Sequence, residues 1–177
     1  MVDLLDPRPG ERWADLGCGS GFFTLVLSAR VGGEGLVYAI DIAPEALRAV
    51  EEEAKRRGAG NVRPLLSADW EIPLPEGEVD GVLVVDVLSE AADPGLLLEE
   101  ARRITRRGGR LLVVEWKRDA PHPPGPPVAE RLTPAALWGL CASSGWVAGR
   151  REEAGPYHFA ALFTAGDPLP RPSALDW

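Results

Sequence analysis

The chain has 177 residues, a length that suits one domain with a sizeable buried core. Its formal net charge of −8 gives it no general attraction for nucleic-acid phosphates, so we expect no nucleic-acid substrate. No run approaches the roughly 18 apolar residues of a membrane span, and the first residues lack the pattern of a signal peptide. We therefore expect a cytoplasmic protein.

The rare residue types give further expectations. Cys18 and Cys141 do not make a disulfide framework, and the isolated His122 and His158 have no metal-ligand spacing, so we expect no metal. Only Lys55 and Lys117 are lysine among 19 cationic residues, glutamine is absent, and proline reaches 17. This bias fits a heat-adapted, thermophile source, although a GC-rich genome would also produce the excess of arginine and proline.

The first half of the chain alternates between predicted strands and helices. Apolar runs and helix breakers predict a strand over 12–16, a helix over 22–31, a strand over 36–40, a helix over 44–57 and a strand over 62–67. Gly32–Gly35 and Gly58 end the two helices, and Pro44 suits the first turn of the second.

The second half continues the pattern and then changes it. We expect a strand over 79–85, a helix over 94–107, a strand over 110–116, a helix over 134–144 and two closing strands over 146–152 and 157–164. Asp93 caps the first of these helices and Gly108-Gly109 end it, while Thr133-Pro134 begin the second. The alternation predicts an α/β, doubly wound sheet with an antiparallel final strand, in a single domain over 1–165 with a proline-rich tail over 166–177.

Three glycines at alternate positions follow the first strand: Gly17, Gly19 and Gly21. A strand, a tight turn and a helix start expose backbone N–H groups on a patch without side chains, which suits a nucleotide. A turn that holds no ligand is the alternative. The dinucleotide pattern G-x-G-x-x-G needs a third glycine where Phe22 stands, and Asp15 would repel a pyrophosphate but suit a cation.

Residues 15–21, Asp-Leu-Gly-Cys-Gly-Ser-Gly, resemble the first motif of the class I S-adenosylmethionine-dependent methyltransferases. The resemblance covers about residues 8–165 and is greatest to the small-molecule, ubiquinone/menaquinone-biosynthesis-like type. It implies a Rossmann-like seven-stranded sheet of order 3-2-1-4-5-7-6 with strand 7 antiparallel. It also implies that the turn, Cys18 included, wraps the methionine end of S-adenosyl-L-methionine, which carries an ammonium and a sulfonium.

Acidic residues stand at or just beyond the predicted carboxyl ends of five strands, the edge where such sheets bind ligands. They are Asp15, Asp41, Asp69, Asp86 and Glu115. A single carboxylate after a strand is usually a turn former or a helix cap, and Asp41 could cap the helix that starts at Pro44. Five together favour a binding site.

The resemblance implies roles for several of these positions. Asp41 matches the acceptor of the ribose hydroxyls, and Ile42 would pack against adenine. Asp86 matches the fourth motif, which borders the transferable methyl group. An NAD enzyme would use an acid at Asp41 as well, so this residue does not separate the two cofactors.

The loop over 67–70, Ser-Ala-Asp-Trp, matches the family segment that recognises the adenine amino group. In that match Asp69 is the acceptor and Ala68 lies beside it. Trp70 is either a lid over the cofactor or a packed aromatic residue.

The catalytic residues are less defined. A sulfonium methyl is already activated, so alignment supplies much of the rate, and a general base is needed only if the acceptor loses a proton. Glu90 and Glu115 are candidate bases, although each also suits a helix start or a solvated position. Family members often have a histidine near 89–90, which is absent here.

The segment 117–132, rich in proline, is the main candidate for acceptor contacts, through Trp116 and His122. A stiff surface connection is the alternative. Family members often carry substrate-binding helices ahead of the first motif, where this chain has about a dozen residues. We therefore expect an open cofactor seat, covered by a second subunit in a homo-oligomer or by a large acceptor.

The sequence thus predicts methyl transfer from S-adenosylmethionine to an unidentified small-molecule acceptor. One alternative is a non-catalytic S-adenosylmethionine-binding partner or regulatory subunit. The other is a Rossmann oxidoreductase that uses NAD, which Phe22 disfavours.

Overall fold

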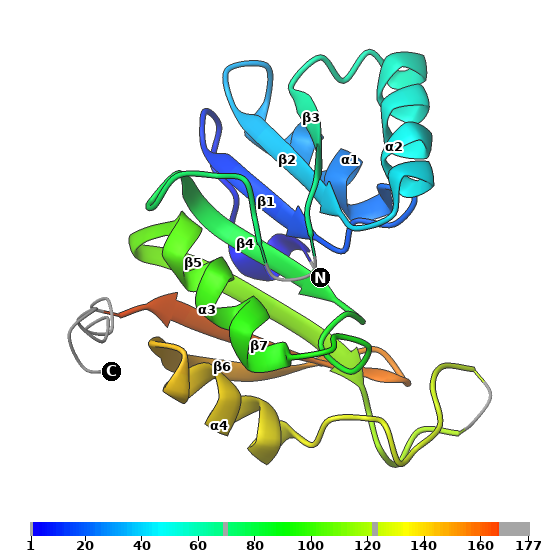
Figure 1. Ribbon diagram of the computed structural model, residues 1–177, viewed down its shortest axis with the longest axis vertical. Helices are drawn as coiled ribbons and strands as arrows, with labels where there is room; N and C mark the ends of the chain where they lie inside the picture. Colours follow the sequence, from blue (N-terminus) through cyan, green and yellow to red (C-terminus); the bar gives the residue numbers. More distant parts are fainter. Residues whose placement is uncertain (1, 69–70, 122–123, 167–177) are drawn as a thin grey trace.

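The computed structural model describes residues 2–68, 71–121 and 124–166. Figure 1 shows a twisted sheet with helices on both faces. The elements are a 3₁₀ helix η1 (Val2–Leu5), β1 (Arg12–Leu16), α1 (Phe22–Val31), β2 (Leu36–Asp41), α2 (Pro44–Arg57), β3 (Val62–Leu66), β4 (Val79–Val85), α3 (Pro94–Ile104), β5 (Thr105–Trp116), α4 (Pro134–Ser143), β6 (Trp146–Ala154) and β7 (His158–Ala165).

The sheet has the predicted strand order, β3-β2-β1-β4-β5-β7-β6. Strands β1 to β5 are parallel to one another, whereas β7 runs antiparallel to both β5 and β6. The carboxyl ends of the five parallel strands therefore meet at one edge. Because β7 runs in the opposite direction, its first residue, His158, lies at that same edge, opposite Trp116 of β5.

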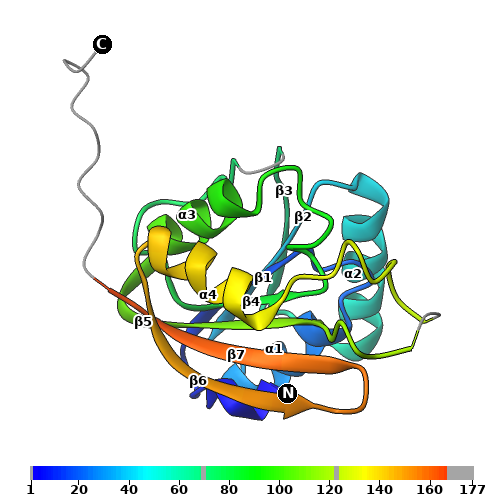
Figure 2. The ribbon, with the colours of Figure 1, turned by 90° about the horizontal axis from the view of Figure 1, so that it is seen from below.

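The helices form two layers, which Figure 2 shows from the end of the sheet. Leu98 of α3 and Leu137 of α4 pack with β-strand residues in one core cluster. Leu27 of α1 and Val2 of η1 pack in a second cluster on the opposite face. Helix α2 covers the β2 end of that second face through Val50. The central strands are buried on both sides, as their continuous apolar runs predict.

The predicted end of helix α3 at Arg107 is wrong. The helix ends at Ile104, and β5 starts at Thr105 rather than Arg110. The pairing of β4 with β5 jumps from Val79–Thr105 to Gly81–Arg110, so the residues between form an irregular excursion within the strand. A Cβ on Gly109 would lie 2.4 Å from Thr105 Cγ2 and 2.8 Å from the Asp80 carbonyl oxygen. The glycine pair thus permits a close backbone approach inside a strand instead of ending a helix.

The other predicted boundaries agree to within two residues. Asp93 Oδ1 accepts from the N–H groups of Gly95 and Leu96 at 2.9 and 3.0 Å, and Thr133 Oγ1 accepts from Ala136 at 3.1 Å, so both predicted caps are confirmed. The division into a domain over 1–165 and a tail stays a prediction, because residues 167–177 lie outside the described residues.

No helix within the described ranges has both the length and the apolar character needed to cross a bilayer.

The described part of the proline-rich segment is organised around Arg131, which is 2% exposed. Its guanidinium donates to five backbone carbonyls at 2.7–3.3 Å: those of Lys117, Ala120, Pro121, Pro124 and Pro126. Prolines have no backbone N–H, so this loop has few donors of its own for those oxygens. The buried arginine supplies them and holds the segment in one conformation.

Replacement of Arg131 tests this arrangement. We expect Arg131→Met to lower the free energy of unfolding by about 3 kcal/mol, because the buried carbonyls lose their donor. The matched control is Arg118→Met on the same segment, where the arginine is exposed and the expected change is within about 0.5 kcal/mol. Urea unfolding followed by circular dichroism measures both; equal stability of the two variants would contradict the arrangement.

Candidate functional site

A cavity of about 480 Å³ lies at the carboxyl ends of β1, β2 and β4. The edge of an open α/β sheet at this switch point is where ligands bind. Its lining is Leu16, Gly17, Gly19, Ile40, Asp41, Ile42, Ser67, Ile72, Val85, Asp86, Val87, Glu90, Ala91, Ala92, Asp93 and Leu97. The four ionisable lining residues are all acids: Asp41, Asp86, Glu90 and Asp93.

The glycine turn between β1 and α1 is tied to the end of β2. The N–H groups of Gly17 and Cys18 both donate to the carbonyl of Ile40, at 2.8 and 3.1 Å. The N–H of Gly19 donates to Asp41 Oδ2 at 2.9 Å. These bonds fix the turn beside the neighbouring strand.

Glycine is needed at the three positions for different physical reasons. All have positive φ, between 51° and 82°, which favours glycine. A Cβ on Gly17 would lie 2.4 Å from Val87 Cγ2, and one on Gly21 would lie 2.8 Å from Val50 Cγ2, so both allow close packing. A Cβ on Gly19 would meet nothing within 4 Å. Gly19 alone of the three leaves open space that a ligand can fill.

Asp41 uses both carboxylate oxygens. Oδ2 accepts from Gly19, and Oδ1 accepts from the N–H of Ala43 at 2.9 Å. The residue before helix α2 is Ala43, which makes no side-chain cap, so Asp41 orders the helix entry from two residues earlier. Each carboxylate oxygen has a second lone pair for a further donor in the cavity.

Asp15 lies beneath the turn, 3% exposed, and does not line the cavity. Its Oδ2 accepts from the Thr24 hydroxyl at 2.6 Å, which links β1 to α1. Burial raises the pKa of Asp15 to about 7; the hydrogen bonds from Thr24 oppose the rise and the charge of Asp41 adds to it. Cys18 is also buried, and burial together with Asp15 raises the pKa of its thiol.

The residues expected near adenine lie partly at the cavity. Ile42 is 60% exposed and lines it, which leaves an apolar surface open to a ring. Ser67 lines it, whereas the adjacent Ala68 is exposed and pairs with Glu71 in a short bridge. Asp69 and Trp70 lie outside the described residues.

Asp86 follows β4 in a left-handed conformation, with φ of 56°, which is uncommon for a non-glycine residue. Its N–H donates to the Val114 carbonyl at 2.9 Å, and its Oδ2 lies 3.2 Å from Nε2 of His158. Burial raises the pKa of Asp86, His158 lowers it, and Glu90 raises it. The sequence pattern did not single out His158 for this site, although the antiparallel direction of the last strand puts the first residues of that strand at this edge.

The two candidate bases differ in position. Glu115 is fully buried, and its Oε1 accepts from the N–H of Leu88 at 2.9 Å, which holds the loop after β4. Burial raises the pKa of Glu115 to about 7, an effect reduced by Ser89 and increased by Asp86. Glu90 is exposed and lines the cavity. Only Glu90 of the two reaches the cavity.

Trp116, expected to contact the acceptor, does not line the cavity but packs against His158, with ring centroids 4.1 Å apart. The guanidinium carbon of Arg131 lies over the Trp116 ring, 5.5 Å from the ring centroid. His122 lies outside the described residues. Among those described, no group of three potential metal ligands was found.

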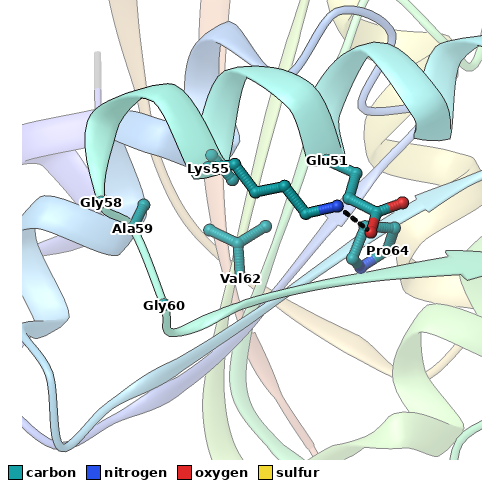
Figure 3. A pocket seen from close by; sticks show the side chains of 8 residues that line it. Glu51, Lys55, Gly58, Ala59, Gly60, Val62 and Pro64 are labelled. Atoms are coloured by element: carbon teal, nitrogen blue, oxygen red, sulfur yellow. Dashed lines mark hydrogen bonds and ion pairs between the residues drawn. The ribbon is translucent and has the colours of Figure 1, made fainter.

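A second hollow, of about 320 Å³, lies between the end of α2 and the start of β3 (Figure 3). Glu51 and Lys55 form an exposed ion pair there at 2.8 Å. This groove lies at the amino ends of the parallel strands, opposite to the edge that collects the acids.

A sequence model of the methyltransferase domain family matches residues 14–113, more than half of the chain. The chain belongs to this family. The matched range contains the glycine turn, Asp41 and Asp86, which carried the resemblance in the sequence. The predicted family is therefore confirmed.

Curated relatives of this methyltransferase domain match over part of their length. The demethylmenaquinone methyltransferase of Geobacillus kaustophilus is 31% identical over 115 residues, 65% of this chain and 49% of the relative. The nocamycin O-methyltransferase of Saccharothrix syringae is 39% identical over 113 residues, 63% of this chain and 40% of the relative. The chain spans half or less of the length of these relatives.

Solved structures match over more of the chain. A SAM dependent methyltransferase from Aquifex aeolicus is 30% identical with a TM-score of 0.87, over 93% of this chain and 87% of that one. The [4+2]-cyclase SpnF is 16% identical with a TM-score of 0.79, over 93% of this chain and 79% of that one. The second likeness shows the fold alone, and its name shows that the fold also occurs with another activity.

The buried carboxyl of Asp15 predicts that stability falls as pH rises from about 4 to about 7. Its pKa is higher folded than unfolded, so the stabilisation present below about pH 4 is lost as pH rises through about 7. One such group changes the unfolding free energy by about 1.4 kcal/mol per pH unit in this window.

We expect Asp15→Asn to reduce the change of unfolding free energy with pH by about 1.4 kcal/mol per pH unit. The buried Glu115 keeps its own contribution in this variant. The control, Glu34→Gln at an exposed position, should have the same pH dependence as the parent. Urea unfolding at several pH values measures it. A parent-like slope in Asp15→Asn would contradict the assignment.

Proposed function

We propose that the cavity binds S-adenosyl-L-methionine and that the protein is an enzyme that transfers the methyl group to a small-molecule acceptor. The observation that supports this most directly is the joint position of the glycine turn and Asp41 at a cavity whose ionisable lining is wholly acidic. A cationic sulfonium and ammonium suit that lining, whereas the pyrophosphate of NAD would be repelled. Lysine and arginine are absent from the described lining residues.

The residues suggest how each part of the cofactor is held. Asp41 would accept the ribose hydroxyls with its second lone pairs, and the exposed Ile42 would cover adenine. The open side of Gly19 would take the methionine end, with Gly17 beside it. Cys18, Gly21 and the buried Asp15 would support the turn from beneath, through packing and the bond to Thr24.

The remaining positions complete the proposed site. Asp86 and Glu90 would lie near the sulfonium, at the end of β4. Ala68, Asp69 and Trp70 follow Ser67 and stay proposed contacts of the adenine side. Trp116 and His122 stay proposed contacts on the acceptor side.

When bound, S-adenosylmethionine would supply a methyl group already activated by its sulfonium, so the site has only to align it with the lone pair of the acceptor. The rigid turn aligns the donor, because its N–H groups are fixed to β2. The apolar walls, including Leu16, Ile72 and Leu97, would reduce the contact of the reacting atoms with water. The carboxylates attract the charged donor more than the neutral sulfide product, which favours product release.

A small-molecule acceptor is supported by the relatives, which are named for demethylmenaquinone and nocamycin. Because the chain spans half or less of those relatives, their acceptors are not carried over. Cytoplasmic location and a heat-adapted source are further parts of this proposal, supported by the two free, buried cysteines and by the 17 prolines. A homo-oligomer that covers the cavity is compatible with its open edge.

Donor binding is the first test. By titration calorimetry we expect S-adenosylmethionine and S-adenosylhomocysteine to bind and NAD to give no signal. Gly19→Ala should weaken the binding of both compounds by at least tenfold, because the alanine side chain enters the space that the donor fills. Gly10→Ala is the control, since Gly10 also has positive φ (83°), no atom near its Cβ and a place outside the cavity. Binding of NAD, or equal loss in both variants, would overturn the proposed cofactor site.

Methyl transfer is the second test. With a radiolabelled methyl donor and a panel of phenol, quinol and amine acceptors, we expect label in at least one acceptor. Asp41→Ala should reduce the transfer by at least tenfold through weaker donor binding, and the exposed Glu34→Ala should not. A chain that binds the donor but labels no acceptor would support a non-catalytic binding subunit instead.

A further inference from the structure

One histidine at the binding edge has no part in the function proposed so far. His158 begins β7, directly opposite Trp116 at the end of β5, and its Nε2 lies 3.2 Å from Asp86 Oδ2. Three elements that are far apart in sequence thus bring an imidazole to a carboxylate that lines the cavity.

The imidazole is held in one orientation. Its ring packs on Trp116 at a centroid distance of 4.1 Å and an interplanar angle of 46°. Trp116 is backed in turn by Arg131 and by Gly125, where a Cβ would lie 2.6 Å from the indole. The loop built around Arg131 therefore fixes the histidine through the tryptophan.

The ring has a free side. With Nε2 directed at Asp86, Nδ1 makes no hydrogen bond to any of the described residues, and the side chain keeps 20% of its surface exposed. A carboxylate that accepts from one ring nitrogen selects the tautomer with a lone pair on the other. Nδ1 then carries a lone pair that can take a proton.

The carboxylates Glu115 and Glu90 at this edge are less suited than His158 to take the proton of an acceptor. Glu115 is fully buried and bound to the Leu88 N–H, so an acceptor cannot reach it without displacing the loop. Glu90 is exposed, and among the described residues no side-chain hydrogen bond orients it as Asp86 orients His158.

We propose that His158 is the catalytic proton acceptor of the methyl transfer, that Asp86 positions it, and that the acceptor substrate carries an acidic hydroxyl of the phenol or enol class. The proposal rests on the proposed function. The acceptor O–H bond breaks and its proton passes to Nδ1. The oxygen lone pair forms the bond to the methyl carbon, and the electrons of the C–S bond pass to sulfur, which becomes a neutral sulfide.

Several charged groups lie near the His158 imidazole and affect its protonation. Asp86, Glu90 and Glu115 lie on the β4 and β5 side. Arg131 lies behind Trp116, and Lys117 and Tyr157 meet beside the strand start, where the Lys117 N–H donates to the Tyr157 carbonyl at 2.8 Å. Of these, Asp86 alone is bonded to the imidazole.

Nuclear magnetic resonance of the ring nitrogens tests the proposal without an acceptor. The chain has two histidines, so His158→Asn assigns the signals. We expect the neutral ring to carry its proton on Nε2. Asparagine tolerates the left-handed backbone at position 86, so Asp86→Asn should reduce the share of the neutral ring that carries its proton on Nε2, and the exposed Glu153→Gln on β6 should leave that share unchanged.

The two cofactor forms provide a second readout. The sulfonium of S-adenosylmethionine is charged and the sulfide of S-adenosylhomocysteine is not, so the midpoint of the ring titration should be lower in the former complex. A histidine with a purely structural role away from the methyl would show the same midpoint in both.

The outcomes separate the two proposals. A proton on Nδ1, or equal midpoints in the two complexes, would overturn the role of His158 while donor binding stands. Absence of binding by either compound in calorimetry would overturn the proposed function itself. His158→Asn should bind S-adenosylhomocysteine within twofold of the parent and, with a phenol acceptor, lose about 100-fold in rate.

Discussion

The hydrogen bonds between the glycine turn and the end of β2 are the constraint on which the site depends. The Ile40 carbonyl accepts from two successive N–H groups of the turn, and Asp41 accepts from a third. Left-handed glycines alone would leave the turn free to move, since they permit a conformation without selecting it. The hydrogen bonds select it, and Val50 and Val87 close in where no Cβ intervenes. As a result, the open side of Gly19 faces a cavity whose charged groups are acidic.

Much of this could be predicted from local sequence. Continuous apolar runs marked the central strands, because a parallel sheet is buried on both faces. Proline after Asp93 and after Thr133 marked helix starts, and both side chains cap as expected. Acids after consecutive strands could be placed at one edge because parallel strands share a direction. Asp41, Asp86 and Glu90 do line the cavity. Asp15 and Glu115 share the edge but point into the interior, a difference that burial decides and sequence spacing does not contain.

What could not be predicted depends on partners distant in sequence. The start of β5 at Thr105 requires the backbone of β4 beside Gly109. The proline-rich segment was expected to contact the acceptor or to be a stiff surface connection. The sequence did not show that Arg131 binds its carbonyls, because the acceptors of an arginine cannot be identified from the residues next to it in the chain. His158 appeared isolated because Asp86 lies 72 residues earlier. In each case a tertiary contact, rather than a local propensity, determines the structure.

The most direct test of the proposed cofactor site is to map the chemical-shift changes of the backbone amides by nuclear magnetic resonance when S-adenosylhomocysteine is added to the isotope-labelled chain. The account predicts the largest changes at Gly17, Gly19 and the residues after Asp41, where the turn meets β2. It predicts little change in the groove between α2 and β3 that Figure 3 shows. Changes centred on Lys55, Gly60 and Val62, with an undisturbed glycine turn, would contradict it.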